Sequence, residues 1–359
     1  MRIAISTGGG DAPGLNAVIR AVVLSALNRS WKVFGIRRGF GGLMGDARVV
    51  PLDRENVRGI THLGGTILGT TNRGNPFRWP MLQTDGTWTE VDRSDELIAS
   101  FRQLELDALV AVGGEGTLAI AQRLFKKGLP VVGVPKTIDN DVRGTVVTFG
   151  FDTAVQTATD AIDKIHSTAE SHERVIVVEV MGRDAGWIAL ASGLAGSADV
   201  ILIPEIPFDN DRVCEKIRQR EAAGRHFSIV VAAEGAKPQE GSRSVKSGAA
   251  PGGMERLGGI GERVGAYIAQ HTGKETRTLT LGHLQRGGFP TTFDRLLALR
   301  FGAAAVRAVA DERFGEMVVL DPPEVKTASM EEALGGPRLV PLDSDTVCTA
   351  RELGISFGD

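Results

Sequence analysis

The sequence has few cysteines, little net charge and no long apolar run. Two cysteines in 359 residues cannot build a disulfide framework, which predicts a reducing, cytoplasmic environment. The net charge of −3 offers no basic surface for binding nucleic acid. No apolar stretch reaches ~18 residues, so we expect no membrane partner, and the N-terminus has no signal-peptide pattern. Any phosphate site must therefore be a local feature.

Glycine, in contrast, is abundant, and glycine-rich turns follow short β-branched strands. The 46 glycines indicate tight turns and close approach of the backbone to ligands. The order strand, turn, helix is predicted twice, at 2–7, 8–14 and 16–27, and at 108–112, 113–116 and 117–127. Further strands are expected at 129–134, 175–180, 200–203 and 229–233, with a helix from Trp187. This alternation predicts right-handed βαβ units in parallel sheets, whose ligands bind beyond the carboxyl ends of the strands.

The length predicts two domains of ~150 residues each. One segment interrupts the alternation, because residues 237–261 are rich in Gly, Pro, Ser, Lys and Arg and have no periodicity. We expect a long surface loop or insertion there.

Two of the glycine-rich turns are candidates for anion binding. Three glycines between Thr7 and Asp11 expose backbone N–H groups before a helix, although a plain tight turn is the alternative. The turn at 113–117 carries an acid, Glu115, which would repel phosphate unless a divalent cation bridges the two. Glu115 is thus a candidate Mg²⁺ ligand, the alternative being a solvated charge at a helix N-terminus. Neither turn has the Gly-x-Gly-x-x-Gly or phosphate-loop pattern.

A lysine and two carboxylates follow the apolar run 129–134. Asp139 and Asp141 stand at a strand end, where a carboxylate can take a proton from a hydroxyl. Lys136 adds a cation beside them, which suits developing negative charge on a phosphoryl group. The alternative for the Thr137–Asp141 stretch is an Asx-rich turn that ends the strand.

Several basic residues also stand beside glycines at predicted strand ends. An arginine guanidinium can grip phosphate with two parallel N–H groups. Each arginine alone could equally be a surface residue. The members of this group are Arg73, Arg174, Arg183, Arg277, His283 and Arg286.

Taken together, these motifs resemble those of the 6-phosphofructokinases. The matching stretches are Gly-Gly-Asp-Ala-Pro-Gly-Leu-Asn-Ala (9–17), Gly-Gly-Thr-Ile-Leu-Gly-Thr (64–70), Gly-Gly-Glu-Gly-Thr (113–117), Pro-Lys-Thr-Ile-Asp-Asn-Asp (135–141), Phe-Gly-Phe-Asp-Thr-Ala (149–154), Glu-Val-Met-Gly-Arg (179–183) and Gly-His-Leu-Gln-Arg-Gly-Gly (282–288). They occur in order over about residues 1–310, and the last ~50 residues carry little resemblance.

The resemblance implies two doubly wound, Rossmann-like α/β/α domains with the active site in the cleft between them. Residues 1–150 plus about 285–330 would bind the phosphoryl donor. Residues 151–284 plus about 331–359 would bind the sugar phosphate, with the insertion at 237–261. The implied reaction is Mg²⁺-dependent transfer from ATP to the 1-hydroxyl of fructose 6-phosphate, which gives fructose 1,6-bisphosphate in glycolysis.

The resemblance also implies roles for individual residues. Asp139 would be the base, and Thr137, Asp141 and Arg183 would complete the catalytic group. Glu115 would lie on the Mg²⁺ side. The donor would be held by Gly10, Arg73, Gly113, Gly114, Gly116, Thr117 and Lys136. Fructose 6-phosphate would be held by Arg174, Met181, Gly182, Arg183, Glu234, Arg277, His283 and Arg286. Because some of these arginines come from a neighbouring subunit in the family, a homodimer or homotetramer is expected.

Two positions bear on the phosphoryl donor. Lys136 is typical of pyrophosphate-using members, since a second phosphate needs a cation there. Those members usually have Asp at the position of Gly116, where it repels the α-phosphate of ATP. Glycine at 116 does not exclude ATP, so ATP is the expected donor and reversible, pyrophosphate-dependent transfer is the alternative. Glu115 and Phe40 also depart from the family, which usually has Asp and, in many bacterial members, Tyr.

Other possibilities remain open on the sequence. Arg20 and Arg54 match basic effector-site positions of regulated members, but Leu24 and His166 replace expected arginines, so we expect weak or no nucleotide effector control. NAD kinases and lipid kinases share a loop like 113–117 but lack the 282–288 motif. A related sugar substrate, such as sedoheptulose 7-phosphate, and a non-catalytic sugar-phosphate-binding paralogue are further alternatives.

Overall fold

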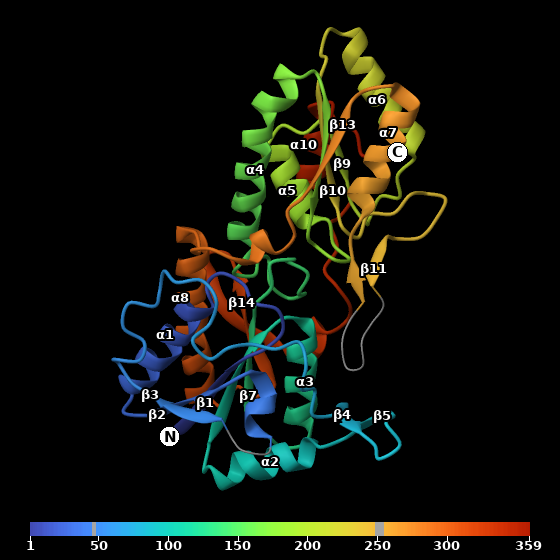
Figure 1. The fold of residues 1–359 in the computed structure, drawn as a ribbon. Helices are drawn as coiled ribbons and strands as arrows, with labels where there is room; N and C mark the ends of the chain where they lie inside the picture. Colours follow the sequence, from blue (N-terminus) through green and yellow to red (C-terminus); the bar gives the residue numbers. More distant parts are fainter. Residues whose placement is uncertain (45–47, 248–254) are drawn as a thin grey trace.

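A mixed seven-stranded sheet forms the centre of the lower lobe in Figure 1. The computed structural model describes residues 1–44, 48–247 and 255–359. The strand order is β15-β14-β7-β6-β1-β2-β3, with β1 (Arg2–Thr7), β2 (Lys32–Ile36), β3 (Val49–Leu52), β6 (Ala108–Gly113), β7 (Val131–Pro135), β14 (Glu316–Asp321) and β15 (Glu324–Ser329). The central strands are parallel, whereas β3 and β15 are antiparallel edges. The carboxyl ends of β1, β6 and β7 are therefore adjacent.

Helices cover both faces of this large sheet. Along β1, Ile3 and Ile5 face the layer of α1 (Leu15–Leu27) and α8 (Thr292–Ala310), while Ala4 faces α2 (Ser94–Gln103) and α3 (Glu115–Lys126). Successive strand residues point to opposite faces, so a continuous apolar run supplies two cores. This explains why the strands lack polar alternation.

The upper lobe contains a smaller, all-parallel sheet in the order β13-β8-β10-β9. Its strands are β8 (Val175–Val180), β9 (Val200–Leu202), β10 (Ser228–Ala233) and β13 (Thr276–Thr280). One face packs on α4 (Phe151–Ser171) and α5 (Trp187–Ala195), and the other on α6 (Asn210–Ala222) and α7 (Ile260–Thr272). The two sheets confirm the predicted class of two doubly wound α/β/α units. Each of the strands expected from the sequence lies within two residues of its predicted bounds, but the parallel strands β2, β13 and β14 and the antiparallel edges β3 and β15 were not predicted.

Smaller elements complete the described chain. They are η1 (Gly39–Leu43), a ribbon of β4 (Trp79–Leu82) and β5 (Trp88–Val91), η2 (Gly282–Arg286), α9 (Met330–Ala333) and α10 (Asp345–Glu352). The chain crosses between the lobes at α4, returns between β13 and α8, and crosses again after α9, where it runs up to α10 (red in Figure 1). Among the helices that the structure describes, none is long and apolar enough to cross a membrane.

The expectation of a structureless insertion at 237–261 is wrong for part of the segment. Short antiparallel strands, β11 (Val245–Ser247) and β12 (Arg256–Leu257), pair within it, and α7 begins at Ile260. The buried Glu179 carboxylate accepts hydrogen bonds from the backbone N–H groups of Gly259 (2.9 Å) and Gly261 (2.8 Å). Glu179 thereby provides hydrogen-bond acceptors for backbone N–H groups at the start of α7. The composition of the segment does not reveal this role. Residues 248–254 lie outside the described part of the chain.

Candidate active site

The two glycine-rich turns meet around one side chain, that of Thr117. A Cβ at Gly113 would lie 2.3 Å from Cβ of Thr117, and a Cβ at Gly8 would lie 2.8 Å from its hydroxyl oxygen. Only glycine therefore fits at both positions. A Cβ at Gly116 would meet nothing within 4 Å. Because no side chain caps the start of α3, its first N–H groups are available to an anion.

A third loop holds the turn after β1 in place. The Thr70 hydroxyl donates to the carbonyl of Gly9 (2.6 Å), and the Gly9 amide donates to the carbonyl of Thr71 (3.0 Å). Arg73 follows this loop with an exposed side chain. Phe40 is buried in η1 and belongs to the core on the α2–α3 side of the sheet. Arg73 thus lies two residues beyond Thr71, whose carbonyl binds the 8–10 turn, and Phe40 has a packing role.

Lys136 connects the end of β7 to the first turn. Its side chain is 2% exposed, and its ammonium group donates to the carbonyl of Gly10. Burial and the nearby Arg286 charge together lower the pKa of Lys136 to about 8, against the opposing effect of Asp11, Asp139 and Asp141. The lysine is therefore a buried cation held between the candidate donor turn and the candidate catalytic carboxylates.

Asp139 lies in a tightly bonded turn directly after β7. Its amide donates to the Thr137 hydroxyl oxygen (3.0 Å), and that hydroxyl lies 3.4 Å from the Asp139 carboxylate. Asn140, with φ 54°, accepts from the Thr148 amide (3.1 Å), and the Thr148 hydroxyl donates to the Thr137 carbonyl (2.8 Å). Asp139 is 4% exposed, and its Oδ1 has no hydrogen-bond partner among the described residues. An unpartnered buried carboxylate oxygen is available to a substrate hydroxyl.

Three carboxylates of this region have raised pKa values. Burial raises the pKa of Asp139, against the lowering effect of Arg286, Arg183, Thr137 and Lys136. Burial and the Asp139 charge raise the pKa of Asp141 to about 7, and Glu115 adds to that shift. In the other lobe, burial and Asp139 raise the pKa of Glu234 to about 7. Asp141 is thus repelled by both Asp139 and Glu115, although no three such side chains in the described part of the chain are grouped closely enough to hold a metal ion.

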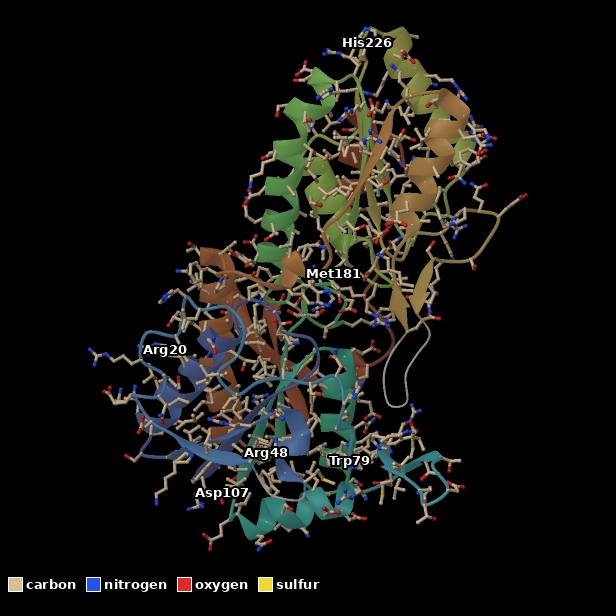
Figure 2. All side chains as sticks on the ribbon, in the orientation of Figure 1. Arg20, Arg48, Trp79, Asp107, Met181 and His226 are labelled. Carbon is tan, nitrogen blue, oxygen red and sulfur yellow. The ribbon has the colours of Figure 1, made fainter. Side chains whose placement is uncertain are left out.

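The end of β8 supplies the opposite wall. Met181 lies between the lobes in Figure 2. Arg183 has φ 50°, and its amide donates to the Glu234 carboxylate (3.3 Å). Gly182 has φ 141°, and a Cβ at Gly235 would lie 1.7 Å from the Arg183 carbonyl oxygen. The strained backbone of residues 182 and 183 is thus held by glycines and by Glu234, at the edge of the small sheet that faces Asp139.

The predicted sugar-phosphate residues fall into two groups. Arg286, in η2, turns toward the loop after β1, where its guanidinium donates to the Asp11 carbonyl (3.1 Å) and lies 2.9 Å from a Cβ built at Gly10. Arg174 and Arg277 instead meet at Glu275, with contacts of 3.2 and 2.6 Å. These two arginines lie at the amino ends of β8 and β13. Because β8 is about 20 Å long, they are far from Met181 at its other end.

His283 shares η2 with Arg286 but is exposed. Sequence reasoning grouped His283, Arg174, Arg277 and Arg286 around one phosphate. Within this chain the structure separates His283 and Arg286, which share η2, from Arg174 and Arg277 at the amino ends of β8 and β13. Where the chain passes from β13 into η2 and α8, large apolar side chains are exposed: Leu284 is 70%, Phe289 66% and Leu296 57% exposed. Exposed apolar side chains of this size are typical of protein–protein contact surfaces when they form one continuous patch.

The candidate effector-site residues have partners inside the chain. Arg20 donates to the Val57 carbonyl (2.6 Å), and Arg54 donates to the Asn28 side chain (2.6 Å). The His166 ring hydrogen-bonds with the Gly196 carbonyl (2.7 Å). Weak or absent effector control stays a prediction.

These features can be compared with known proteins. The sequence profile described as Phosphofructokinase matches residues 2–309. The chain belongs to the phosphofructokinase family. It is 54% identical over 361 residues to an ATP-dependent 6-phosphofructokinase of Chloroflexus aggregans, a match that covers 100% of this chain and 98% of the relative. The last ~50 residues, which carry little of the motif resemblance, are therefore shared with this relative.

Two further similarities are informative. A pyrophosphate–fructose 6-phosphate 1-phosphotransferase of Amycolatopsis mediterranei is 49% identical over 347 residues, which covers 96% of this chain and 97% of the relative. Among solved structures, Pichia pastoris phosphofructokinase in the T-state superposes with a TM-score of 0.80 at 31% identity. That match covers 99% of this chain and 37% of the Pichia chain. Relatives whose names specify different phosphoryl donors thus share similar sequence identity with this phosphofructokinase.

Proposed function

We propose that this chain is an ATP-dependent 6-phosphofructokinase, which transfers the γ-phosphoryl group of ATP to the 1-hydroxyl of fructose 6-phosphate. The product is fructose 1,6-bisphosphate, and such a glycolytic role would place the enzyme in the cytoplasm. The observation that carries the proposal is the buried, unpartnered Oδ1 of Asp139, which lies between the donor-side turns and the edge of the small sheet. Full-length similarity to ATP-dependent relatives supports the same reaction.

Asp139 acts as the base in this proposal. Its raised pKa makes the carboxylate a better acceptor for the proton of the sugar 1-hydroxyl. The Thr137 hydroxyl and the Arg286 guanidinium, 3.4 and 4.0 Å from Oδ2, hold the carboxylate so that Oδ1 stays free. The hydroxyl oxygen then attacks the phosphoryl group in line, a reaction in which positioning and charge neutralisation do most of the catalytic work.

The donor phosphates lie, in this proposal, along the turns 8–10 and 113–117. The uncapped N-terminus of α3 supplies N–H groups, and Lys136 supplies a buried cation. Glu115 and Asp141 would hold Mg²⁺ in this proposal, because carboxylate oxygens are ligands of this ion and a cation would offset their mutual repulsion. No group of three His, Cys, Asp or Glu side chains that could hold a metal occurs in the described chain, so phosphates and water would complete the coordination. When bound, Mg²⁺ would neutralise charge on the transferred phosphoryl group.

The sugar phosphate is held from the small sheet and from a second subunit. Met181, Gly182, Arg183 and Glu234 form the near wall, while Arg174 and Arg277 are too far along β8 to reach the same sugar. We infer that Arg174 and Arg277 serve the site of a neighbouring copy, whereas His283 shares η2 with Arg286 and belongs to the site of its own chain. The exposed apolar side chains of η2 and α8 support an oligomer.

The same reasoning divides the chain between two domains. Residues 1–150 with about 285–330 bind the donor, and residues 151–284 with about 331–359 bind the sugar phosphate. Supporting this division, β14 and β15 join the large sheet, whereas Ser356 pairs with Val200 of β9 in the small sheet.

Pyrophosphate is the second candidate donor. The buried Lys136 cation favours it, and so does the similarity to the Amycolatopsis phosphotransferase. The open space at Gly116 favours ATP, because no atom within 4 Å of a Cβ built there would block an α-phosphate.

The reaction can be tested with the purified wild-type chain and its Asp139→Asn variant. Each is incubated with Mg²⁺, ATP and fructose 6-phosphate, and the products are followed by ³¹P NMR. We expect a second phosphomonoester signal from fructose 1,6-bisphosphate with the wild type only. Release of inorganic phosphate without that signal would refute the proposed reaction. Equal amounts of product from both proteins would refute the role of Asp139.

A further inference from the structure

The C-terminal segment makes a contact beside the candidate catalytic loop. After α9 the chain leaves the large sheet and runs toward α10 in the other lobe (Figure 1). The amide of Arg338 donates to the Asp141 carbonyl (2.7 Å). The Arg338 guanidinium donates twice to the Val146 carbonyl, at 3.1 and 2.7 Å. One residue thus binds the backbone of the loop at both of its ends.

The same arginine is fastened to the small-sheet lobe. The Trp187 indole N–H donates to the Arg338 carbonyl (2.8 Å), and the guanidinium lies 4.2 Å from the centre of the Trp187 ring. Trp187 is the first residue of α5. Two residues further on, the Val340 amide donates to Glu205 (2.9 Å), which also accepts from the Gly186 amide. These contacts fix Arg338 against the start of α5, a few residues beyond Arg183.

We propose that Arg338 is a positioning residue that sets the Asp139–Asp141 turn against the Met181–Arg183 edge of the small sheet. This inference rests on the proposed function, in which the turn supplies the base and the small-sheet edge holds the sugar. Phosphoryl transfer depends on the relative placement of these two halves, because little covalent chemistry is left to the protein. No motif of the sequence includes Arg338.

The charge of Arg338 adds to its geometric role. Burial lowers the pKa of Arg338, and the Asp141 carboxylate raises it in return, so the guanidinium and this carboxylate attract each other. The guanidinium is also stacked on an aromatic ring, which holds its plane toward the Val146 carbonyl. A lysine could keep the charge but could not stack and donate twice in the same way.

Three variants test this proposal in the full-length protein. Arg338→Ala removes the guanidinium, and Arg338→Lys keeps the charge. Arg351→Ala is the matched control, since Arg351 belongs to the same C-terminal segment, lies 5.0 Å from the centre of the Phe357 ring and pairs with Asp359, away from the catalytic turn. Steady-state kcat and KM for ATP and fructose 6-phosphate are measured well below each melting temperature.

For Arg338→Ala we expect kcat to fall about 10- to 100-fold, the loss typical of a misplaced reacting group. The KM for ATP should change less than about threefold, because the donor turns lie on the large sheet alone. Arg338→Lys should recover part of the lost kcat, and Arg351→Ala should keep the wild-type kcat. A wild-type kcat in Arg338→Ala, or the same kcat loss in Arg338→Ala and Arg351→Ala, would overturn the proposal.

Coupling to Trp187 provides a second readout. The kcat losses of Arg338→Ala and Trp187→Leu should be less than additive in the double variant, since both remove the same contact. Additive losses would contradict the assigned role.

If the wild type turned over neither ATP nor pyrophosphate, the proposed function would fail. The role of Arg338 would then be tested by amide hydrogen exchange. We expect residues 139–148 to exchange faster in Arg338→Ala than in the wild type, and at the wild-type rate in Arg351→Ala. Equal exchange rates in Arg338→Ala and the wild type would count against the proposal.

Discussion

The guanidinium of Arg286 lies 4.0 Å from the carboxylate of Asp139, measured from Nη2 to Oδ2. This pair joins η2, which follows the last strand of the small sheet, to the turn after β7 of the large sheet. Both side chains are mostly buried, so solvent screens their attraction only weakly. Arg286 opposes the effect of burial on the pKa of Asp139 without cancelling it. The result is a carboxylate with a raised pKa that is held in one orientation.

The first prediction concerns Asp139 itself. Asp139→Asn keeps the shape of the side chain but removes the proton acceptor, so kcat should fall about 10²- to 10⁴-fold. Binding of fructose 6-phosphate should be retained, because Asp139 is not among the residues proposed to hold it. Turnover and calorimetric titration with fructose 6-phosphate measure the two effects. Loss of binding together with turnover would show that Asp139 holds the sugar rather than acts as the base.

The second prediction concerns stability and pH. The Asp141 pKa is raised to about 7 in the folded state, compared with about 4 in an unfolded chain. The folded state therefore binds more protons, and the stability present below about pH 4 is lost as the pH rises through about 7. Asp141→Asn should raise the free energy of unfolding by roughly 1–3 kcal/mol near pH 8 and by much less near pH 5.

Chemical denaturation of Asp141→Asn at several pH values measures this difference. Asp95→Asn is a suitable control, because the Asp95 side chain is 87% exposed. We expect no such pH-dependent gain in the control. A gain for Asp141→Asn that did not vary with pH would mean that the buried charge is not its cause.

The third prediction separates charge from shape at the donor turn. Gly116→Ala should be tolerated, because its Cβ would meet nothing within 4 Å. Gly116→Asp should also fold but should lower kcat/KM for ATP at least about tenfold through repulsion of phosphate. Gly113→Ala should lower the melting temperature, since its Cβ would lie 2.3 Å from Thr117. Unchanged use of ATP by Gly116→Asp would place the nucleotide away from this turn.

The fourth prediction tests the sharing of arginines between subunits. Arg277→Ala alone and Asp139→Asn alone should both be poorly active. If Arg277 serves the site of a neighbour, a hybrid oligomer contains some sites with neither substitution. Mixing the two variants under conditions that exchange subunits should therefore restore part of the activity. An activity equal to the average of the two separate variants would indicate that each chain uses its own Arg277.

Much of the fold could be predicted because its strands carry strong local signals. β1, β6, β7, β8 and β10 are short β-branched runs followed by glycine turns or polar residues, and the parallel order follows from the intervening helices. The antiparallel edges β3 and β15 have no such signal. β3 contains a proline and is partly exposed, and β15 alternates polar residues with only partial burial. The β11–β12 pairing was hidden by a composition that is typical of a loop.

The candidate site was predictable only where the motifs lie next to one another at strand ends. Asp139, Lys136 and Thr117 are close because β6 and β7 are neighbours in one sheet. Arg174 stands at the amino end of β8, and its separation from Met181 depends on the length and direction of that strand rather than on motif content. Arg338 carries no local pattern at all, since its contacts arise from the path of the chain between the two sheets.

The central claim, that ATP is the phosphoryl donor, is tested most directly by comparing the two donors in one assay. The purified chain is given fructose 6-phosphate and Mg²⁺ with either ATP or pyrophosphate as the sole donor, and kcat/KM is measured for each. We predict that ATP supports turnover and that its kcat/KM exceeds that of pyrophosphate. Turnover with pyrophosphate alone would contradict the account, because the buried Lys136 cation rather than the open space at Gly116 would then decide the donor.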